Sequence, residues 1–312
     1  MADQTLGRKI YDGAIVALEV MVLDLKMMFS LIKAIFEFFV PPKLKSVENE
    51  IILITGTGHG MGREVALRLG RLGGKVICVD INKKGNQETV DLIRKESGKA
   101  YRYECDVTNR EAVLELKEKV CREVGEVTML INNAGIMPCK PFLAHNAAEI
   151  RAVFELNIIA HHWTCQAFLP SMMERNHGHI VAMSSMAGLL GLRNLVPYCA
   201  TKYGVRGFME SLSEELREHP KDYSGIKFTT IFPYIVDTGL CKNPKVKFTN
   251  LMKIVSPQEA ADQIVDSIRR NYFSNTIPKS MHYNIMMANA LPRDVGLHAK
   301  DFVDSGLDPH PY

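Results

Sequence analysis

Short apolar runs alternate with longer segments whose apolar residues recur every three to four positions, from residue 50 to residue 272. The short runs are typical of buried strands, and the longer spacing is typical of helices that cover a sheet. We expect strands at 51–54, 75–80, 100–105, 128–132, 179–184 and 226–232, and helices at 63–72, 84–96, 109–124, 149–175, 198–219 and 257–272. This alternation predicts an α/β fold with a doubly wound parallel sheet in three layers.

Helix boundaries are marked by a few residues. Ser256 and Pro257 are typical of an N-cap and a first helical position, and Pro220 is expected to end the preceding helix. The pattern divides the chain into a segment 1–47, a main domain 48–280 and a tail 281–312, for which no structure is predicted.

The segment from Gly13 to Val40 is strongly apolar, yet charges interrupt it, whereas a membrane-spanning helix needs about 20 largely uncharged residues. On a helix, the polar residues fall on one narrow stripe, and only Asp24 lies off it: Asp12, Glu19, Lys26, Ser30, Lys33 and Glu37. Such an amphipathic helix is expected to associate with a membrane or lipid surface; the alternative is packing on its own domain or a twin subunit. Pro41 and Pro42 should end it, and Lys43 and Lys45 could meet anionic headgroups.

Composition narrows the possible partners. The 312 residues are 46% hydrophobic and 23% charged, which suits one large α/β domain with appendages. The net charge is +3 without a basic block, which argues against nucleic acid as a partner. Seven scattered cysteines without a CxxC pair fit a reducing compartment, so free thiols and no structural metal are expected.

The stretch from Thr55 to Gly62 joins a predicted strand to a predicted helix. Gly56 would allow a tight turn, Gly60 would let the backbone approach a pyrophosphate, and Gly62 would let helix and strand pack closely. An ordinary strand-to-helix turn is the alternative. Asp80 ends the second strand, where a carboxylate can bind an adenosine ribose and repel a 2′-phosphate, so NAD is favoured over NADP. Lys83 and Lys84 could soften that preference.

Candidate reaction residues follow later strands. Tyr198 and Lys202 are four apart on a predicted helix and so share a face, where the ammonium would favour the phenolate and bring its pKa towards working pH. Ser185 or Ser184, at the end of the fifth strand, could hydrogen-bond the substrate oxygen. Asn157, inside an apolar helix, needs a polar partner and suggests a relay.

Taken together, the motifs resemble the short-chain dehydrogenase/reductase superfamily, with its Rossmann-type fold, over about residues 48 to 280. The order and spacing of Thr55-Gly56, Asp106, Asn132 to Gly135, Asn157, Ser185, Tyr198 and Lys202 match, and the thirteen-residue gap to Tyr198 selects Ser185. The resemblance implies catalytic roles for Asn157, Ser185, Tyr198 and Lys202. It implies cofactor contacts from Gly56, Gly60, Met61, Gly62, Asp80, Asp106, Val107, Asn133, Ala134, Gly135, Tyr198, Lys202, Pro233 and Thr238.

More narrowly, the chain is similar to the lipid-associated branch that contains 17β-hydroxysteroid dehydrogenases types 11 and 13 and epidermal retinol dehydrogenase 2. The shared stretches include Pro41 to Val47, the glycine turn with His59, Leu169 to Val181, and Asn243-Pro244. The resemblance implies an enzyme of the endoplasmic reticulum or lipid droplets, on the cytoplasmic face, acting with NAD on a steroid, retinoid or fatty alcohol, and a homodimer through helices 149–175 and 198–219. A lipid-droplet scaffold with little turnover is the alternative. Tyr234 departs from the glycine usual after Pro233 and is expected to reshape the nicotinamide pocket.

Overall fold

The computed structural model describes residues 2–241, 244–245, 247, 254–282, 285, 287, 291–303, 306–307 and 309. The chain divides into two compact units, Met1–Leu44 and Lys45–Tyr312. Asn243, one of the residues of the family resemblance, lies outside the described residues.

The first unit is the helix α1 (Ala2–Phe39), which ends just before Pro41 and Pro42 as predicted. Its large apolar side chains are exposed from Tyr11 onward, with Phe29 70% exposed. No helix among the described residues combines the length and apolar character needed to cross a membrane. Association of α1 with a lipid surface therefore stays a prediction.

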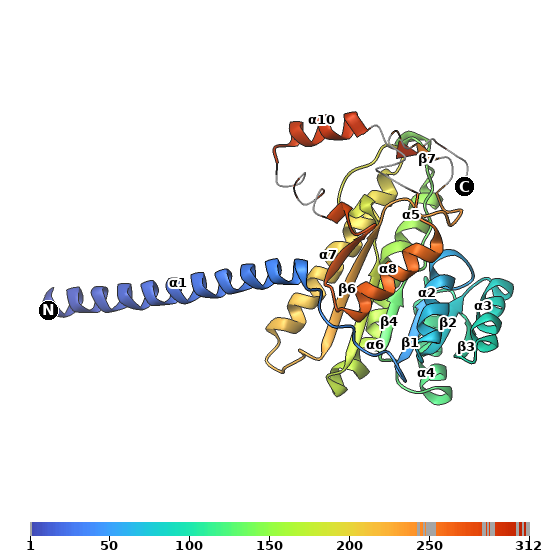
Figure 1. The fold of residues 1–312 in the computed structure, drawn as a ribbon, viewed down its shortest axis with the longest axis horizontal. Coiled ribbons are helices and arrows are strands. Elements are labelled where there is room, and N and C mark those ends of the chain that lie inside the picture. The colour runs from blue at the N-terminus through green and yellow to red at the C-terminus, as the bar shows by residue number, and fades with distance from the viewer. Residues whose placement is uncertain are drawn as a thin grey trace. The chain divides into compact units, whose positions relative to one another are not determined.

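The second unit is built on a sheet of seven parallel strands (Figure 1). The strands are β1 (Ile51–Thr55), β2 (Lys75–Asp80), β3 (Lys99–Glu104), β4 (Met129–Asn132), β5 (Gly178–Met183), β6 (Ile226–Pro233) and β8 (Ser274–Ile277). Their order in the sheet is β3-β2-β1-β4-β5-β6-β8, with every printed pair parallel. The Rossmann-type fold is confirmed, and β8 is a strand that the sequence pattern did not reveal.

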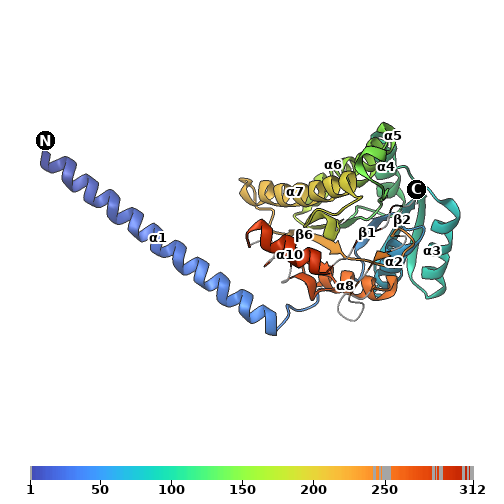
Figure 2. The same ribbon diagram turned by 90° about the horizontal axis from the view of Figure 1, so that it is seen from above.

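Helices cover both faces of this sheet, α4, α6 and α7 on one and α2 and α8 on the other (Figure 2). The bounds are α2 (Gly60–Arg71), α3 (Lys83–Lys95), α4 (Arg110–Glu123), α6 (Ala160–Arg175), α7 (Val196–Glu218) and α8 (Pro257–Arg269). Successive side chains of a strand point to opposite faces. Ile52 and Ile54 of β1 therefore join the core beneath α2, α3 and α8, whereas Leu53 joins the core beneath α4, α6 and α7.

Several shorter elements refine the predicted pattern. The helix expected at 149–175 consists of α5 (Ala147–Phe154), a π-helical segment η2 (Glu155–Ile159) and α6. The 3₁₀ turns η1 (Phe142–Ala144) and η3 (Met186–Gly188) follow β4 and β5. Towards the C-terminus lie α10 (Arg293–Val303) and the small antiparallel pair β7 (Pro244–Lys245) and β9 (Gly306–Leu307). Ser256 caps α8 with Pro257 in its first turn, as predicted.

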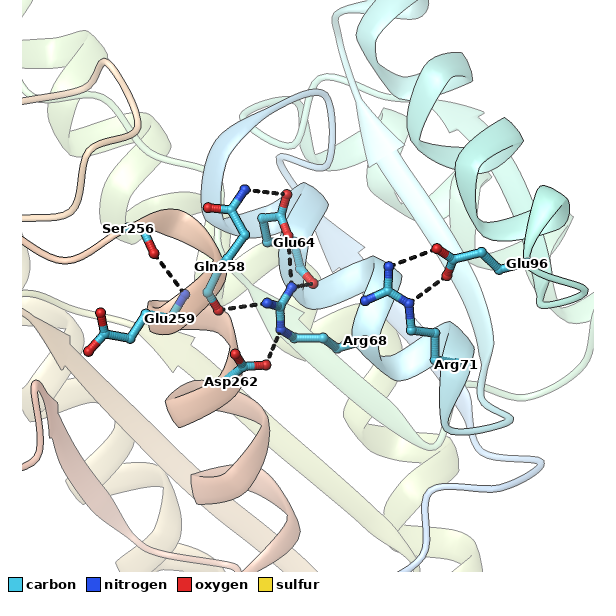
Figure 3. A network of polar contacts seen from close by, with 8 residues as sticks. All are labelled: Glu64, Arg68, Arg71, Glu96, Ser256, Gln258, Glu259 and Asp262. Atoms are coloured by element: carbon cyan, nitrogen blue, oxygen red, sulfur yellow. Dashed lines mark hydrogen bonds and ion pairs between the residues drawn. The ribbon is translucent and has the colours of Figure 1, made fainter.

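A polar network joins the helix after the glycine turn to α8 (Figure 3). The Arg68 guanidinium donates to the Glu64 carboxylate at 2.7 Å, to the Gln258 backbone carbonyl at 2.7 Å and to the Asp262 carboxylate at 2.5 Å. Arg71 forms a bidentate pair with Glu96, beyond the end of α3. One arginine therefore links α2 to α8.

The expectation that Lys45 meets lipid headgroups is wrong. The Lys45 ammonium donates to the buried His179 ring at 2.8 Å, and burial lowers the pKa of Lys45 to about 8. Its backbone N–H donates to the Arg269 carbonyl at 2.7 Å, and the Arg269 guanidinium returns a bond of 2.9 Å to the Lys45 carbonyl. Sequence could not show this, because an interior histidine from β5 supplies the partner. All seven cysteines are free, as expected.

Candidate active site

The candidate site lies at the carboxyl ends of β1 and β4. These strands are neighbours, and the strand order reverses between them, since β2 follows on one side and β5 on the other. Open α/β sheets form their ligand crevice at such a reversal. The glycine turn leaves β1 and the segment 132–135 leaves β4, so the fold brings both predicted motifs to one crevice.

The glycine turn depends on close backbone contacts. Gly56 and Gly60 have positive φ angles of 74° and 60°, which disfavour a side chain. A Cβ on Gly62 would lie 2.1 Å from the Gly56 carbonyl oxygen, so only glycine fits there. A Cβ on Gly60 would come within 3.2 Å of Thr238. The turn therefore presents bare backbone on the crevice side.

The first backbone N–H groups of α2 have no capping side chain to bond. Its N-cap residue, His59, makes no side-chain cap. By contrast, Asn82, Asn109, Asn146 and Ser256 each cap the helix that follows them. The first N–H groups of a helix need acceptors and attract anions. An uncapped start beside bare glycine backbone fits a pyrophosphate.

Hydrogen bonds of Asn133 and Thr55 join the glycine turn to the end of β4. The Thr55 hydroxyl accepts from the backbone N–H groups of Asn133 and Ala134 at 3.0 and 3.1 Å. The Asn133 amide donates to the carbonyls of Thr55 and Gly56 at 2.8 and 3.1 Å. Asn133 thus positions the glycine turn. Thr55 has a role that the sequence analysis did not assign, although a hydroxyl directly before the glycines was a usable indication.

Asp80 faces the glycine turn, as its position in sequence suggests. Its carboxylate accepts from the backbone N–H groups of Gly58 and Asn82, both at 2.7 Å. Two nearby cations are paired with other carboxylates: Lys83 with Glu104 at 3.0 Å and Arg63 with Glu88 at 3.0 Å. The negative charge at this point therefore has little local compensation from these two residues.

Asp106 and Val107 follow β3 at the same edge of the sheet. The exposed Asp106 carboxylate accepts from the backbone and hydroxyl of Thr108 at 3.0 and 2.7 Å. The Val107 side chain is buried in the core, so a ligand could meet only its backbone.

The two neighbouring serines after β5 have different environments. The Ser184 hydroxyl donates to the backbone carbonyl of Lys202 at 2.9 Å and is buried. The Ser185 oxygen accepts from the Ala187 N–H at 3.2 Å and donates to the Pro233 carbonyl at 3.5 Å, and Ser185 lines the same pocket as Tyr198. Of the two candidates from sequence, the structure thus places Ser185 beside the tyrosine.

Tyr198 and Lys202 lie on one face of α7, and both are buried. Burial raises the pKa of Tyr198 to about 12, while the neighbouring Ser185 hydroxyl acts in the opposite direction. Burial lowers the pKa of Lys202 to about 8. The Lys202 ammonium donates to the Met183 carbonyl at 2.7 Å and lies 5.6 Å from the centre of the Tyr198 ring. The sequence predicted a pKa for Tyr198 closer to working pH. The buried surroundings instead raise this pKa, so the phenol stays protonated at neutral pH.

Asn157 lies in the π-helical segment and is fully buried. Its amide oxygen accepts from the Ile136 N–H, and its amide nitrogen donates to the Ile136 carbonyl, both at 2.9 Å. The same nitrogen donates to the Thr201 hydroxyl at 3.3 Å. A Cβ on Gly135 would lie 3.2 Å from the Asn157 oxygen and 3.7 Å from the Lys202 nitrogen, so this glycine lets the two approach.

A pocket opens beside Ser185 and Tyr198. Pro233, Tyr234 and Thr238 are among its lining residues, and a reshaped nicotinamide pocket at Tyr234 stays a prediction. Most other lining residues are apolar: Met61, Met137, Met186, Ala187, Leu192, Leu195, Ile235, Val236, Leu240 and Cys241. Met137, Leu192 and Leu195 come from loops with no recognisable motif, so sequence alone offered no way to find them.

The crevice suits a dinucleotide, and a buried phenol beside a serine suits proton exchange with an alcohol or carbonyl. Fold and geometry together define the class of dinucleotide-dependent oxidoreductases. The short chain dehydrogenase family matches residues 50–247. Human epidermal retinol dehydrogenase 2 is 37% identical over 279 residues, covering 89% of this chain and 90% of that protein. Human 17-beta-hydroxysteroid dehydrogenase 13 is 37% identical over 277 residues, which cover 89% of this chain and 91% of that protein.

Solved structures agree on the fold. A short chain dehydrogenase/reductase from Burkholderia phymatum in complex with NAD is 22% identical, with a TM-score of 0.70 over 86% of this chain and 98% of that chain. A metagenomic short-chain oxidoreductase in complex with NADP is 26% identical, with a TM-score of 0.60 over 70% of this chain and 90% of that chain. The chain belongs to the short-chain dehydrogenase/reductase family, whose members act on CH–OH groups with NAD(P).

Proposed function

We propose that the protein interconverts a lipophilic alcohol, such as a steroid, retinoid or fatty alcohol, and its carbonyl at a membrane or lipid-droplet surface. The observation that carries this proposal is the apolar pocket beside the Ser185 and Tyr198 hydroxyls. Such a pocket suits a lipophilic substrate with one reactive oxygen. The names of the retinol and hydroxysteroid dehydrogenases that resemble this chain support the same substrate classes.

The proposed cofactor is NAD in preference to NADP. Backbone from Gly56 to Gly62 would hold the pyrophosphate, and Asp80 would accept hydrogen bonds from the ribose. Asp106 and Val107 would border the adenine, while Asn133 to Gly135, Pro233 and Thr238 would border the nicotinamide half. When bound here, NAD would contribute the hydride-transfer chemistry.

The side chains of the chain itself handle the substrate oxygen and its proton. Ser185 would orient the oxygen by a hydrogen bond. Tyr198 would donate its proton to the carbonyl oxygen during reduction and take it back during oxidation. Lys202 would hold the nicotinamide ribose and, by its charge, favour the phenolate needed for oxidation. Asn157 would anchor a water that links Lys202 to solvent, and its hydrogen bonds to Ile136 hold the neighbouring loop for this task.

A lipid surface would concentrate such substrates, which are scarce in water. The exposed apolar face of α1 supports this location, on the cytoplasmic side of the endoplasmic reticulum or on lipid droplets. Removal of residues 1–40 should release the protein to the soluble fraction. Persistent sedimentation with membranes would show that α1 is not the anchor. We also propose a homodimer through α5, α6 and α7, which size-exclusion chromatography with light scattering tests.

The deciding experiment is a panel of steroids, retinoids and long-chain alcohols, with NAD and NADP, on protein reconstituted with lipid vesicles. We expect turnover of at least one lipophilic class with NAD. Binding of NAD without turnover across the panel would instead favour a lipid-droplet scaffold with a dehydrogenase fold.

A further inference from the structure

Arg63 is a charged residue near the start of α2 to which the proposed reaction assigns no role. α2 begins at Gly60 and carries no acidic residue in its first turn, so Arg63 lies close to the positive end of the helix dipole, where a cation is unfavourable. Its side chain is only 24% exposed. A cation that is largely withdrawn from water at this end of a helix needs bonds that offset both costs.

The Arg63 guanidinium joins the glycine turn to α3. Its Nη2 atom donates to the Gly58 carbonyl at 2.6 Å and to the Gly85 carbonyl at 3.0 Å. The same nitrogen pairs with the Glu88 carboxylate at 3.0 Å. Gly85 and Glu88 belong to α3, and a Cβ on Gly85 would lie 2.5 Å from the Gly58 carbonyl oxygen. The first part of α3 therefore packs closely on the carbonyl that Arg63 binds.

A buried threonine extends these bonds to the preceding peptide group. The Arg63 Nε atom donates to the Thr89 hydroxyl oxygen at 3.0 Å. That hydroxyl has two backbone carbonyls within reach, and the shorter bond, 2.7 Å, is to Thr57. The N–H of the same peptide group, on Gly58, donates to the Asp80 carboxylate at 2.7 Å. The carbonyl and the N–H of a trans peptide point in opposite directions, so this peptide group is bonded at both ends.

The bonds around Gly58 matter because glycine alone does not fix its backbone. Without a Cβ, Gly58 would let the two peptide groups beside it rotate at little cost. Backbone N–H groups attract a phosphate, whereas a carbonyl oxygen turned towards a phosphate repels it. The orientation of these two peptide groups therefore decides whether the turn can receive an anion.

We infer that Arg63 is a positioning residue: directly or through Thr89, its guanidinium holds both carbonyls beside Gly58 and so fixes the shape of the cofactor turn. The N–H of Gly58 then stays on Asp80, and the turn is organised before the dinucleotide arrives, which lowers the cost of binding. This inference rests on the proposed function, because the glycine turn and Asp80 are its proposed cofactor contacts. Direct binding of a 2′-phosphate by Arg63 is a different role, which the test separates from this one.

The test measures the binding of NADH and of NADPH to the full-length protein by fluorescence. Arg63→Met removes every donor, whereas Arg63→Lys keeps the charge but lacks the planar fork that bonds Thr89 and Gly58 together. We expect the dissociation constant of NADH to rise at least about tenfold in Arg63→Met and to recover only in part in Arg63→Lys. NADPH should lose affinity by a similar factor, because both dinucleotides use the same turn.

Arg71→Met supplies the control on the same helix. Arg71 forms a bidentate pair with Glu96 beyond α3, so this variant also loses an arginine–carboxylate pair but leaves the glycine turn untouched. It should keep the wild-type affinity for NADH. The inference is overturned by wild-type NADH affinity in Arg63→Met, or by a loss that Arg71→Met shares. A loss confined to NADPH would assign Arg63 to the 2′-phosphate and would overturn the inference as well.

Should Arg63→Met not fold, Thr89 gives a second test. Thr89→Val keeps the shape of the side chain and loses the hydroxyl, whereas Thr89→Ser keeps the hydroxyl. NADH affinity should fall about threefold to tenfold in Thr89→Val and stay near the wild-type value in Thr89→Ser; equal affinities would contradict the inference. Wild-type protein that binds neither dinucleotide would overturn the proposed cofactor and this role together. Wild-type binding with no loss in Arg63→Met or Thr89→Val would overturn the role of Arg63 alone.

Discussion

The Ser184 hydroxyl donates to the backbone carbonyl of Lys202 over 2.9 Å. This bond links the end of β5 to α7. It engages the hydroxyl of one of the two serines that were candidates for the reaction. Its neighbour Ser185 lines the pocket beside Tyr198 and donates to the Pro233 carbonyl at 3.5 Å instead. Adjacent residues after a strand point in opposite directions, which separates a structural hydroxyl from a proposed catalytic one.

Replacement of each serine should therefore give different defects. Ser185→Ala should lower kcat about 100-fold with a native melting temperature, because a donor to the developing charge is lost. Ser184→Ala should cost about 1–3 kcal/mol in the free energy of unfolding and keep most activity. Steady-state kinetics and urea unfolding check both. Equal losses of activity in the two variants would contradict the assignment.

The pH dependence should differ between the two reaction directions. Carbonyl reduction needs Tyr198 protonated and Lys202 charged, so kcat/KM should be flat up to about pH 8, the pKa of Lys202, and fall above it. Alcohol oxidation needs the phenolate, so kcat/KM should rise up to about pH 8. Above about pH 8, the phenolate fraction of Tyr198 still rises while the ammonium fraction of Lys202 falls. The two changes offset each other, so kcat/KM should become constant.

Lys202→Met is the matched control for these profiles. It should abolish the change of slope near pH 8 in both directions along with most activity. A break near pH 8 that survives in Lys202→Met would assign that titration to another group, such as Lys45, whose pKa burial also lowers to about 8.

Asp80→Asn should shift cofactor preference towards NADP. The variant keeps an acceptor for one of the two backbone N–H groups, at Gly58 or Asn82, but loses the charge that repels a 2′-phosphate. We expect the ratio of kcat/KM for NADP to that for NAD to rise at least about tenfold. Asp91→Asn, an exposed change on α3, should leave the ratio alone. An unchanged ratio in Asp80→Asn would show that Asp80 does not select the cofactor.

Gly62→Ala tests the packing of the cofactor turn. Its Cβ would lie 2.1 Å from the Gly56 carbonyl oxygen, so α2 or β1 must move, at a cost of about 3 kcal/mol. NAD binding should be lost with it. The control is Gly207→Ala on α7, where an added Cβ would meet no atom within 4 Å beyond its chain neighbours and its own helix backbone, and the helix should gain about 0.5–1 kcal/mol. Calorimetric unfolding and NAD titration measure both; native NAD affinity in Gly62→Ala would contradict the proposed turn.

The sequence pattern predicted most of the layered fold because buried parallel strands and amphipathic helices have distinct periods. It missed β8, whose four residues include Asn275 and Thr276, polar side chains that are nevertheless buried. The Asn275 amide donates to the Ser267 hydroxyl on α8 at 2.8 Å. The strand is stabilised by its pairing with β6 and by this bond to another element, so no local period reveals it.

The same reason limited the prediction of the site. Spacing along α7 was enough to pair Tyr198 with Lys202, since helix geometry is local. The buried environment that raises the pKa of Tyr198 to about 12 depends on how separate elements pack. Lys45 shows the opposite error, since a lysine after an apolar helix was expected at a surface and instead bonds a buried histidine.

The most direct test of the account is the turnover of Tyr198→Phe on the best substrate of the lipid panel. The variant keeps the ring that packs beside Lys202 and loses only the hydroxyl. We predict a fall in kcat of at least about 1,000-fold, with NAD still bound and the melting temperature unchanged. Turnover of Tyr198→Phe at the wild-type rate would contradict the proposed mechanism.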